Sequence, residues 1–326
     1  MAELDLPTTD LGTVNIRNGQ SIVRSPEPVG CKLRSQFTIC DSRFARLVPW
    51  FRVSLVRRHP ACFLLCAFCL LFLLLPTACA PQPLTVTREP VTLRLVAADS
   101  CRPLVRELAD AYEDAHPWVE IQVEVFNSSL AEQTLRTGEA DLALLSWPQT
   151  AVDESPLWSE PFARDGVAVV VHPATPFTET GLAHLQEIFR GRVQEWGGMV
   201  LTVVSREEGS GVRDAFESVV LGKQDVTFNA VVMPSSEAVI EYVARTPGAV
   251  GYVSTLWLSE PAADGVRVPP VEGIRPTPDD VAGARYPITR LLYLAAMGEP
   301  AGEAREFAQW VLGSEGQVLV ASSANW

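Results

Sequence analysis

Apolar and polar positions follow two different periods along residues 91–320, and their alternation predicts strands and helices in turn. Strands are indicated by β-branched runs or by apolar residues at every second position, and helices by apolar residues three or four apart. The predicted strands cover 91–97, 119–125, 141–145, 167–171, 200–204, 251–254 and 288–296. The predicted helices lie around 105–112, 129–137, 182–189, 216–220, 236–245 and 303–312.

This order of elements predicts an α/β fold, because strands that alternate with helices form mainly parallel sheets covered by helices. The stretch is long for a single core and suits two small lobes. We expect lobe 1 to contain 91–166 and 255–326, and lobe 2 to contain 167–254. A ligand cleft is expected between the lobes.

Residues 53–79 have the layout of a secretory signal peptide. Arg57 and Arg58 precede an apolar run over 61–75, and small residues then lead to Cys79. The run is shorter than the roughly 20 residues that a membrane-spanning helix needs, but it fits the apolar part of a signal. The end resembles a bacterial lipobox, with Pro76 where that pattern usually has Leu. The resemblance implies cleavage before Cys79 and a lipid on its sulfur, whereas an uncleaved anchor would tether the same domain outside the membrane.

The segments on either side of this signal differ in character. Residues 1–52 precede it, although a signal peptide should begin at the N-terminus. We therefore expect residues 1–52 to be a disordered extension or untranslated in the native protein. A start at Val53 would give a conventional signal. Residues 80–90 are rich in Pro and suit an extended linker.

Charge and cysteine usage exclude several classes of function. The formal net charge is −13, which repels nucleic acid and anionic headgroups, so no nucleic-acid partner is expected. Only Cys101 follows Cys79, so an exported chain has no internal disulfide. The few His residues lack metal-ligand spacing, and we expect neither a metal nor a cofactor.

Strand-to-helix junctions in this chain are rich in Ser and Gly. In open α/β sheets such junctions bind ligands, because the following helices present free N–H groups there. A plain alternative is that each Ser caps a helix, which contributes about 1 kcal/mol. The four junctions lie at 98–101, 127–129, 145–147 and 206–212.

The junction at 206–212 carries the strongest signal. Gly209 and Gly211 allow close approach of a ligand to the backbone, successive N–H groups form an anion-binding concavity, and Arg206 offers a planar fork to an oxyanion. A tight turn with a surface ion pair is the alternative interpretation. Catalytic motifs are missing: Ser210 lacks the G-x-S-x-G context of a hydrolase elbow, and no P-loop occurs.

The chain resembles the PstS-like phosphate-binding proteins of ABC phosphate importers, which have a two-lobed periplasmic-binding-protein fold. Five segments carry the resemblance: L-Q-E-I-F-R-G at 185–191 with Trp196, R-E-E-G-S-G-V-R at 206–213, T-P-G-A-V-G-Y-V at 246–253, Y-P-I-T-R at 286–290, and the stretch from R-E-F at 305–307 to G-Q at 316–317. The likeness covers nearly all of 91–320. It implies an anion held between two lobes that close on it.

The resemblance also implies a set of ligand-binding residues. By matching position these are Ser100, Ser128, Ser146, Arg206, Glu208, Ser210, Gly211 and Val212. A carboxylate at Glu208 would accept a hydrogen bond from protonated phosphate and disfavour sulfate. The first loop departs from the usual G-S-T-T, since it reads Ala97-Ala98-Asp99-Ser100, and Trp147 stands where Arg is common. Asp99 could accept a proton from phosphate or could spoil the site.

The resemblance therefore implies a monomeric, extracytoplasmic lipoprotein that binds phosphate and delivers it to the permease and ATPase subunits of an importer. A binding or sensory lipoprotein for another oxyanion is the first alternative. A hydrolase that uses Ser210 is the second.

Overall fold

The computed structural model describes residues 88–146, 156–222 and 224–323. The predicted extension, signal peptide and lipidation site at Cys79 lie outside these residues. Trp147 lies outside them too. The main strands are β1 (Val91–Ala98), β2 (Val119–Phe126), β3 (Leu142–Leu145), β4 (Trp158–Val171), β7 (Thr202–Arg206), β8 (Val231–Met233), β9 (Ala249–Ser254) and β10 (Thr289–Ala296). The α-helices are α2 (Arg102–Ala115), α3 (Ser128–Arg136), α4 (Leu182–Phe189), α5 (Gly211–Phe216), α6 (Ser236–Arg245), α7 (Pro278–Ala282), α8 (Gly302–Leu312) and α9 (Ser314–Ser322).

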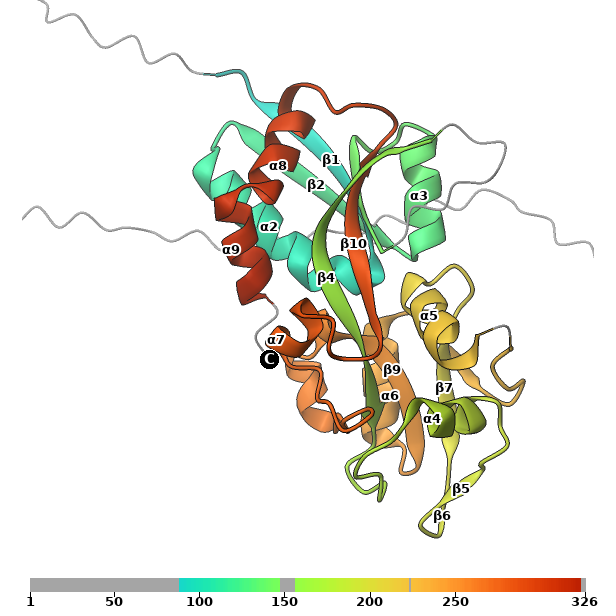
Figure 1. The fold of residues 1–326 in the computed structure, drawn as a ribbon. Coiled ribbons are helices and arrows are strands. Elements are labelled where there is room, and N and C mark those ends of the chain that lie inside the picture. The colour runs from blue at the N-terminus through green and yellow to red at the C-terminus, as the bar shows by residue number, and fades with distance from the viewer. Residues whose placement is uncertain (1–87, 147–155, 223, 324–326) are drawn as a thin grey trace, which may run out of the picture. The chain divides into compact units, whose positions relative to one another are not determined.

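The strands form one mixed sheet in the order β2-β1-β3-β10-β4-β9-β7-β8 (Figure 1). The pairs at its two ends, β2–β1–β3 and β9–β7–β8, are parallel. The central strands β10 and β4 run antiparallel to each other and to their neighbours. The predicted α/β class, with mainly parallel strands and covering helices, is confirmed.

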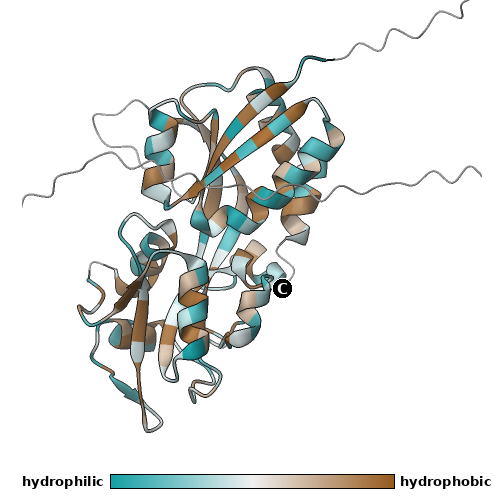
Figure 2. Ribbon diagram, turned by 180° about the vertical axis from the view of Figure 1, so that it is seen from behind, coloured by the Kyte–Doolittle hydropathy of each residue, from teal (hydrophilic) through white to brown (hydrophobic). Residues whose placement is uncertain are grey.

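Lobe 1 is built on β2, β1, β3, β10 and the first part of β4, with helices on both faces of the sheet. Leu93, Leu95 and Ala97 of β1 point to one face, where they pack against α2 and α8. The intervening Val96 points to the opposite face, where Ala131 and Leu135 of α3 cover it. β2 is the edge strand, and its alternating apolar and polar residues give the banded colouring seen in Figure 2.

β4 and β10 carry the chain between the lobes (Figure 1). β4 pairs with β10 up to Gly166 and with β9 from Val167 onward. A side chain at Gly166 would collide with Thr255 Cγ2 at 2.8 Å and with Val281 Cγ2 at 2.9 Å. Position 166, where β4 passes from one lobe to the other, therefore needs a glycine, because the side chains of Thr255 and Val281 pack directly on the backbone there.

Lobe 2 contains the last part of β4, β9, β7 and β8, again with a helical layer on each face. Val167 and Val169 belong to the cluster beneath α4 and α5, and Val170 belongs to the cluster beneath α6. Buried side chains between residues 257 and 288 join these same two clusters: Trp257, Val271, Val281, Tyr286 and Ile288. By core packing the chain thus leaves lobe 2 at the start of β10, whereas the sequence placed this return at residue 255.

The strand predicted over 200–204 is divided in the structure. Two-residue strands β5 (Glu195–Trp196) and β6 (Met199–Val200) form a hairpin, and β7 begins separately at Thr202. Gly197 and Gly198 both have positive φ, at 55° and 81°, which is the conformation that a two-residue hairpin turn requires. The sequence prediction joined Val200 to this strand because the apolar residues continue from 200 to 204. It missed the Gly197-Gly198 turn, which makes Val200 part of the hairpin.

Among the residues that the structure describes, no helix is both long and apolar enough to cross a membrane.

Candidate functional site

Three of the predicted ligand residues meet where the two lobes touch. Ser128 begins α3 in lobe 1, Ser146 follows β3 in lobe 1, and Gly211 begins α5 in lobe 2. The hydroxyls of Ser128 and Ser146 lie 3.0 Å apart, and the backbone N–H of Gly211 donates to Ser128 Oγ at 3.1 Å. We call these residues the Ser–Gly cluster. They present two hydroxyls and a helix-start amide at one point.

Gly211 must be a glycine for this contact to form. A Cβ added at Gly211 would lie 1.7 Å from Ser146 Oγ and 2.6 Å from Ser128 Oγ. A second cross-lobe contact adjoins the first, since Ser129 N donates to Gly209 O at 3.0 Å. At this point the two lobes therefore touch through backbone and hydroxyl groups, with no larger side chain between them.

The plain capping interpretation of the serines is wrong at two of these helix starts. At α3 the cap is Asn127, whose side chain accepts from Leu130 N at 2.9 Å, so the hydroxyl of Ser128 is free to face Ser146 and Gly211. Ser210 occupies the cap position of α5 but makes no side-chain cap bond, and it is buried. Val212 is buried in the core of lobe 2, so only its backbone is available at the site.

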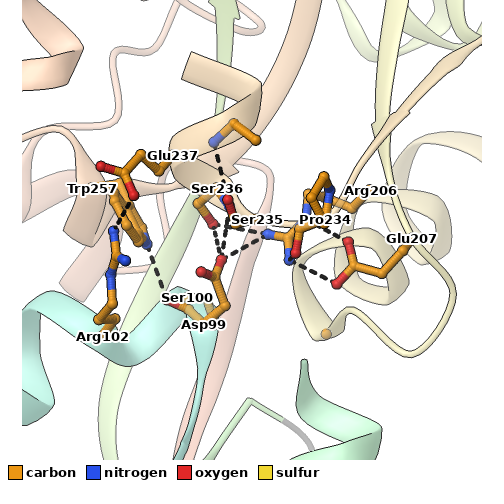
Figure 3. A network of polar contacts seen from close by, with 12 residues as sticks. Asp99, Ser100, Arg102, Arg206, Glu207, Pro234, Ser235, Ser236, Glu237 and Trp257 are labelled. Atoms are coloured by element: carbon orange, nitrogen blue, oxygen red, sulfur yellow. Dashed lines mark hydrogen bonds and ion pairs between the residues drawn. The ribbon is translucent and has the colours of Figure 1, made fainter. Parts of the chain in front are cut away.

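Arg206 ends β7 and is almost fully buried, with 1% of its surface exposed. Figure 3 shows its guanidinium held by groups on several sides. Nε and Nη2 donate to the two carboxylate oxygens of Glu207 at 2.9 and 3.0 Å, and Nη2 also donates to Pro234 O at 3.3 Å. Nη1 donates to Asp99 Oδ2 and to Ser236 Oγ, both at 2.9 Å. All five N–H groups of Arg206 are thereby paired with protein atoms.

Asp99 reaches Arg206 from the opposite lobe. It follows β1 in a single 3₁₀ turn, Asp99–Cys101, and its Oδ2 also accepts from Ser236 N at 2.8 Å and Ser236 Oγ at 2.7 Å. Its backbone carbonyl accepts from Trp257 Nε1 at 3.2 Å. The departure in the first loop therefore has a defined structural result, because the carboxylate of Asp99 pairs with the arginine expected to hold the anion.

Ser100 and Glu208, like the side chains of Ser210 and Val212, do not join these contacts. Ser100 is buried, and within the described part of the chain its hydroxyl contacts Cys101 Sγ at 3.9 Å. Glu208 is exposed, and the carboxylate on Arg206 belongs to its neighbour Glu207. The sequence pattern placed the acidic residue two positions after the arginine, but the tight turn through Gly209, with φ of 80°, directs Glu208 outward.

Ser236 and Arg290 are site residues that the sequence analysis missed. The signal for Ser236 was available, since Pro234-Ser235-Ser236 opens α6 much as the other junctions open theirs. Arg290 of β10 lines a cavity of about 340 Å³ beside the Ser–Gly cluster, together with Ser146, Gly211 and Asp214. Burial raises the pKa of the Asp214 carboxyl, an effect that Arg213 and Arg290 oppose.

No group of acidic, His and Cys residues with the arrangement of a metal site occurs within the described ranges. The buried hydrogen-bond donors at the lobe junction are hydroxyls, backbone amides and a guanidinium, and the Asp99 carboxylate lies among them. Such donors suit an oxyanion.

Comparison with known proteins places this arrangement in a family. A family profile described as "PBP superfamily domain" matches residues 85–315. The chain belongs to the PBP superfamily. The match covers both lobes, and with it the Ser–Gly cluster and Arg206.

Within the superfamily, the chain is distantly homologous to phosphate-binding proteins. It is 26% identical over 230 residues to the phosphate-binding protein PstS of Bacillus subtilis, a match that covers 68% of this chain and 75% of the relative. It is 25% identical over 260 residues to PstS of Pseudomonas aeruginosa, covering 70% and 80%. These relatives are substrate-binding proteins rather than enzymes, which leaves the hydrolase alternative without support.

Solved structures give the same result. A Clostridium perfringens protein described as a phosphate ABC transporter substrate-binding protein, with bound phosphate, aligns with a TM-score of 0.64 and 25% identity. The match covers 72% of this chain and 98% of that one. An ABC-type phosphate transport receptor from Vibrio cholerae aligns with a TM-score of 0.58 and 26% identity, covering 71% and 98%.

Proposed function

We propose that this protein captures phosphate outside the membrane and delivers it to the permease and ATPase subunits of an ABC importer. The observation that carries the proposal is the Ser–Gly cluster, in which hydroxyls from lobe 1 meet the amide of a helix start in lobe 2. The buried Arg290 lines the same cavity as Ser146 and Gly211. Tetrahedral oxyanions bind best to converging neutral donors and a guanidinium in a site shielded from water. The homology to phosphate-binding proteins supports phosphate as the oxyanion.

The ligand-binding residues under this proposal are Ser128, Ser146, Ser210, Gly211 and Arg206. Val212 contributes through its backbone. Ser100 and Glu208 belong to the set implied by the family pattern, and they would have to move to reach a ligand at the Ser–Gly cluster.

Calorimetric titration of the purified, anion-free protein with phosphate, sulfate and arsenate tests the assignment. We expect phosphate to bind and sulfate to bind much more weakly. Arg206→Ala should weaken phosphate binding by about 100-fold, because a charge-assisted pair of hydrogen bonds is worth roughly 1.5–3 kcal/mol. Arg245→Ala is the matched control, since Arg245 is exposed in lobe 2 and pairs with the exposed Glu241. Failure of the folded protein to bind phosphate would refute the ligand assignment.

The sequence supports membrane attachment through a lipid on Cys79. The expected localisation is extracytoplasmic, with the folded domain on the tether 80–90. Labelling with a radioactive fatty acid in the native cell should mark the wild-type protein but not Cys79→Ser. Unlabelled wild type with retained residues 53–79 would instead favour the uncleaved anchor.

A second candidate function is the binding of a different oxyanion for uptake or sensing, and the position of Asp99 favours it. Because the Asp99 carboxylate is hydrogen-bonded to Arg206, it changes which anionic ligands that arginine can bind. The anion titrations separate the two candidates, because a preference for another tetrahedral oxyanion over phosphate would select the second.

A further inference from the structure

Asp99 has the hydrogen-bonding environment of a bound oxyanion. Its Oδ2 accepts from the guanidinium of Arg206, from the backbone N–H of Ser236 at the start of α6 and from the Ser236 hydroxyl, at 2.7–2.9 Å (Figure 3). Asp99 itself is 8% exposed. A guanidinium, a helix-start amide and a hydroxyl are donors that proteins also direct at phosphate and carboxylate ligands.

The guanidinium of Arg206 has no spare donor while this contact exists. Its five N–H groups are divided among Glu207, Asp99, Ser236 and the Pro234 carbonyl. An incoming oxyanion must therefore replace one of these acceptors. Replacement leaves the displaced group to find water or another partner, which lowers the net gain from binding.

Of the two carboxylates on Arg206, Asp99 is the one that an anion can displace. Glu207 is adjacent in the chain, lies in the same lobe and receives two hydrogen bonds from the guanidinium. Asp99 lies in lobe 1 and receives one hydrogen bond from it. Any separation of the lobes pulls Asp99 away from Arg206, whereas Glu207 moves with it.

We propose that Asp99 is an internal competitor for the oxyanion, and that it latches the two lobes together in the ligand-free protein. The proposal rests on the oxyanion-binding function proposed above and assigns its regulation. A ligand that binds only the unlatched state has an apparent affinity equal to its intrinsic affinity multiplied by the fraction of molecules in that state. The affinity for the oxyanion is therefore lower with Asp99 present than the Ser–Gly cluster and Arg206 would give without it.

The opposite role for Asp99 makes the opposite prediction. If Asp99 accepted a proton from bound phosphate, its carboxylate would contribute to binding and its removal would weaken affinity. The direction of the change in affinity therefore decides between the two roles.

The test compares phosphate affinity by calorimetry in the wild type, Asp99→Asn and Asp99→Ser. We expect Asp99→Ser to bind at least about tenfold more tightly, since the competing charge-assisted hydrogen bond is gone. Asp99→Asn, which keeps the shape but not the charge, should fall between. Equal or weaker binding by Asp99→Ser, in a variant that unfolds at the wild-type temperature, would overturn the proposal.

Glu237→Gln is the matched control. Glu237 also forms an ion pair across the lobes, with Arg102 at 2.9 Å, but touches no atom of Arg206 among the described contacts. Its phosphate affinity should equal that of the wild type. A gain in Glu237→Gln as large as in Asp99→Ser would show that any lost cross-lobe charge pair has this effect, and would also overturn the proposal.

A measurement without phosphate separates the latch from the proposed function. By small-angle scattering of the anion-free protein, Asp99→Ser should have a larger radius of gyration than the wild type and Glu237→Gln. If this holds while no variant binds phosphate, the latch stands and the phosphate assignment fails. If the wild type binds phosphate and the radius does not change in Asp99→Ser, the latch is wrong.

Discussion

Two buried arginine–aspartate pairs of this molecule differ in whether they lie within the strands that join the lobes or between the lobes. Asp165 and Arg290 are register partners on β4 and β10, the strands that join the lobes, and Arg290 Nε and Nη2 donate to Asp165 Oδ2 at 2.9 and 2.7 Å. Asp99 and Arg206 come from different lobes and meet at their junction. We call these the hinge pair and the junction pair.

The positions of the two aspartates indicate which pair would persist when the lobes separate. Asp165 Oδ1 accepts from Ser254 Oγ, at the end of β9, and from the backbone and side chain of the following residue, Thr255. Asp165 and Arg290 face each other on directly paired strands, so the two members of the hinge pair stay together when the lobes move. The junction pair has one member on each lobe, so separation of the lobes breaks its hydrogen bond.

The largest expected effect is the loss of the hinge carboxylate. Asp165→Ala should lower the free energy of unfolding by about 3–5 kcal/mol, because it leaves Arg290 buried without its counter-charge. Denaturant unfolding measures it. Glu241→Ala, which removes an exposed pair with Arg245, should cost less than about 1 kcal/mol. Equal costs for the two variants would contradict the importance of burial in the hinge pair.

The junction should respond in ligand binding rather than in stability. Gly211→Ala places a methyl group against the Ser128 and Ser146 hydroxyls of the other lobe, which prevents close approach of the lobes. Phosphate affinity should fall at least about tenfold, or roughly 1.4 kcal/mol, with little change in the unfolding midpoint. Gly298→Ala, where nothing lies within 4 Å of the added carbon, should bind like the wild type.

A partly exposed cross-lobe pair should matter much less than either buried pair. The side chains of Arg102 and Glu237 are 23% and 47% exposed. Glu237→Gln should therefore change the free energy of unfolding by no more than about 0.2–1 kcal/mol, as measured by thermal unfolding. A cost near that of Asp165→Ala would mean that solvent screening is weaker at this edge than its exposure implies.

The smallest response is expected from Cys101, which lies near both pairs. Burial raises the pKa of its thiol from 9.0 to about 12, with Arg290 lowering it and Asp165 raising it. The folded thiol keeps its proton where an unfolded one would lose it, so its contribution to stability is complete below pH 9 and is lost as pH rises toward 12. At pH 8, iodoacetamide should label Cys101 only at the rate of unfolding. Rapid labelling of the folded protein would contradict this burial.

The elements of both lobes were largely predictable because their apolar periodicity is local. The pattern in β2, and the spacing of Val105, Leu108 and Tyr112 in α2, place these residues correctly without any knowledge of partners. Short elements without such periodicity were missed, including the β5–β6 hairpin and α7. The serines at 128 and 146 were found as candidates because helix starts after strands are general positions for anion sites.

The arrangement of charges could not be predicted in the same way. Sequence order favoured Glu208 as the acidic partner at the site and left Asp99 with two opposite roles. The structure directs Glu208 into solvent and brings Asp99 from 107 positions away onto Arg206.

The sequence by itself determined the α/β class, the family and the residue types at the strand ends, because these depend on periodicity and on local motifs. Only the tertiary structure decided which carboxylate pairs with which arginine. Such pairing depends on where strands from two lobes end relative to each other, and a buried guanidinium takes whichever acceptors the fold brings within hydrogen-bonding distance. In this protein that distance selects Asp99 and Glu207 for the junction and Asp165 for the hinge.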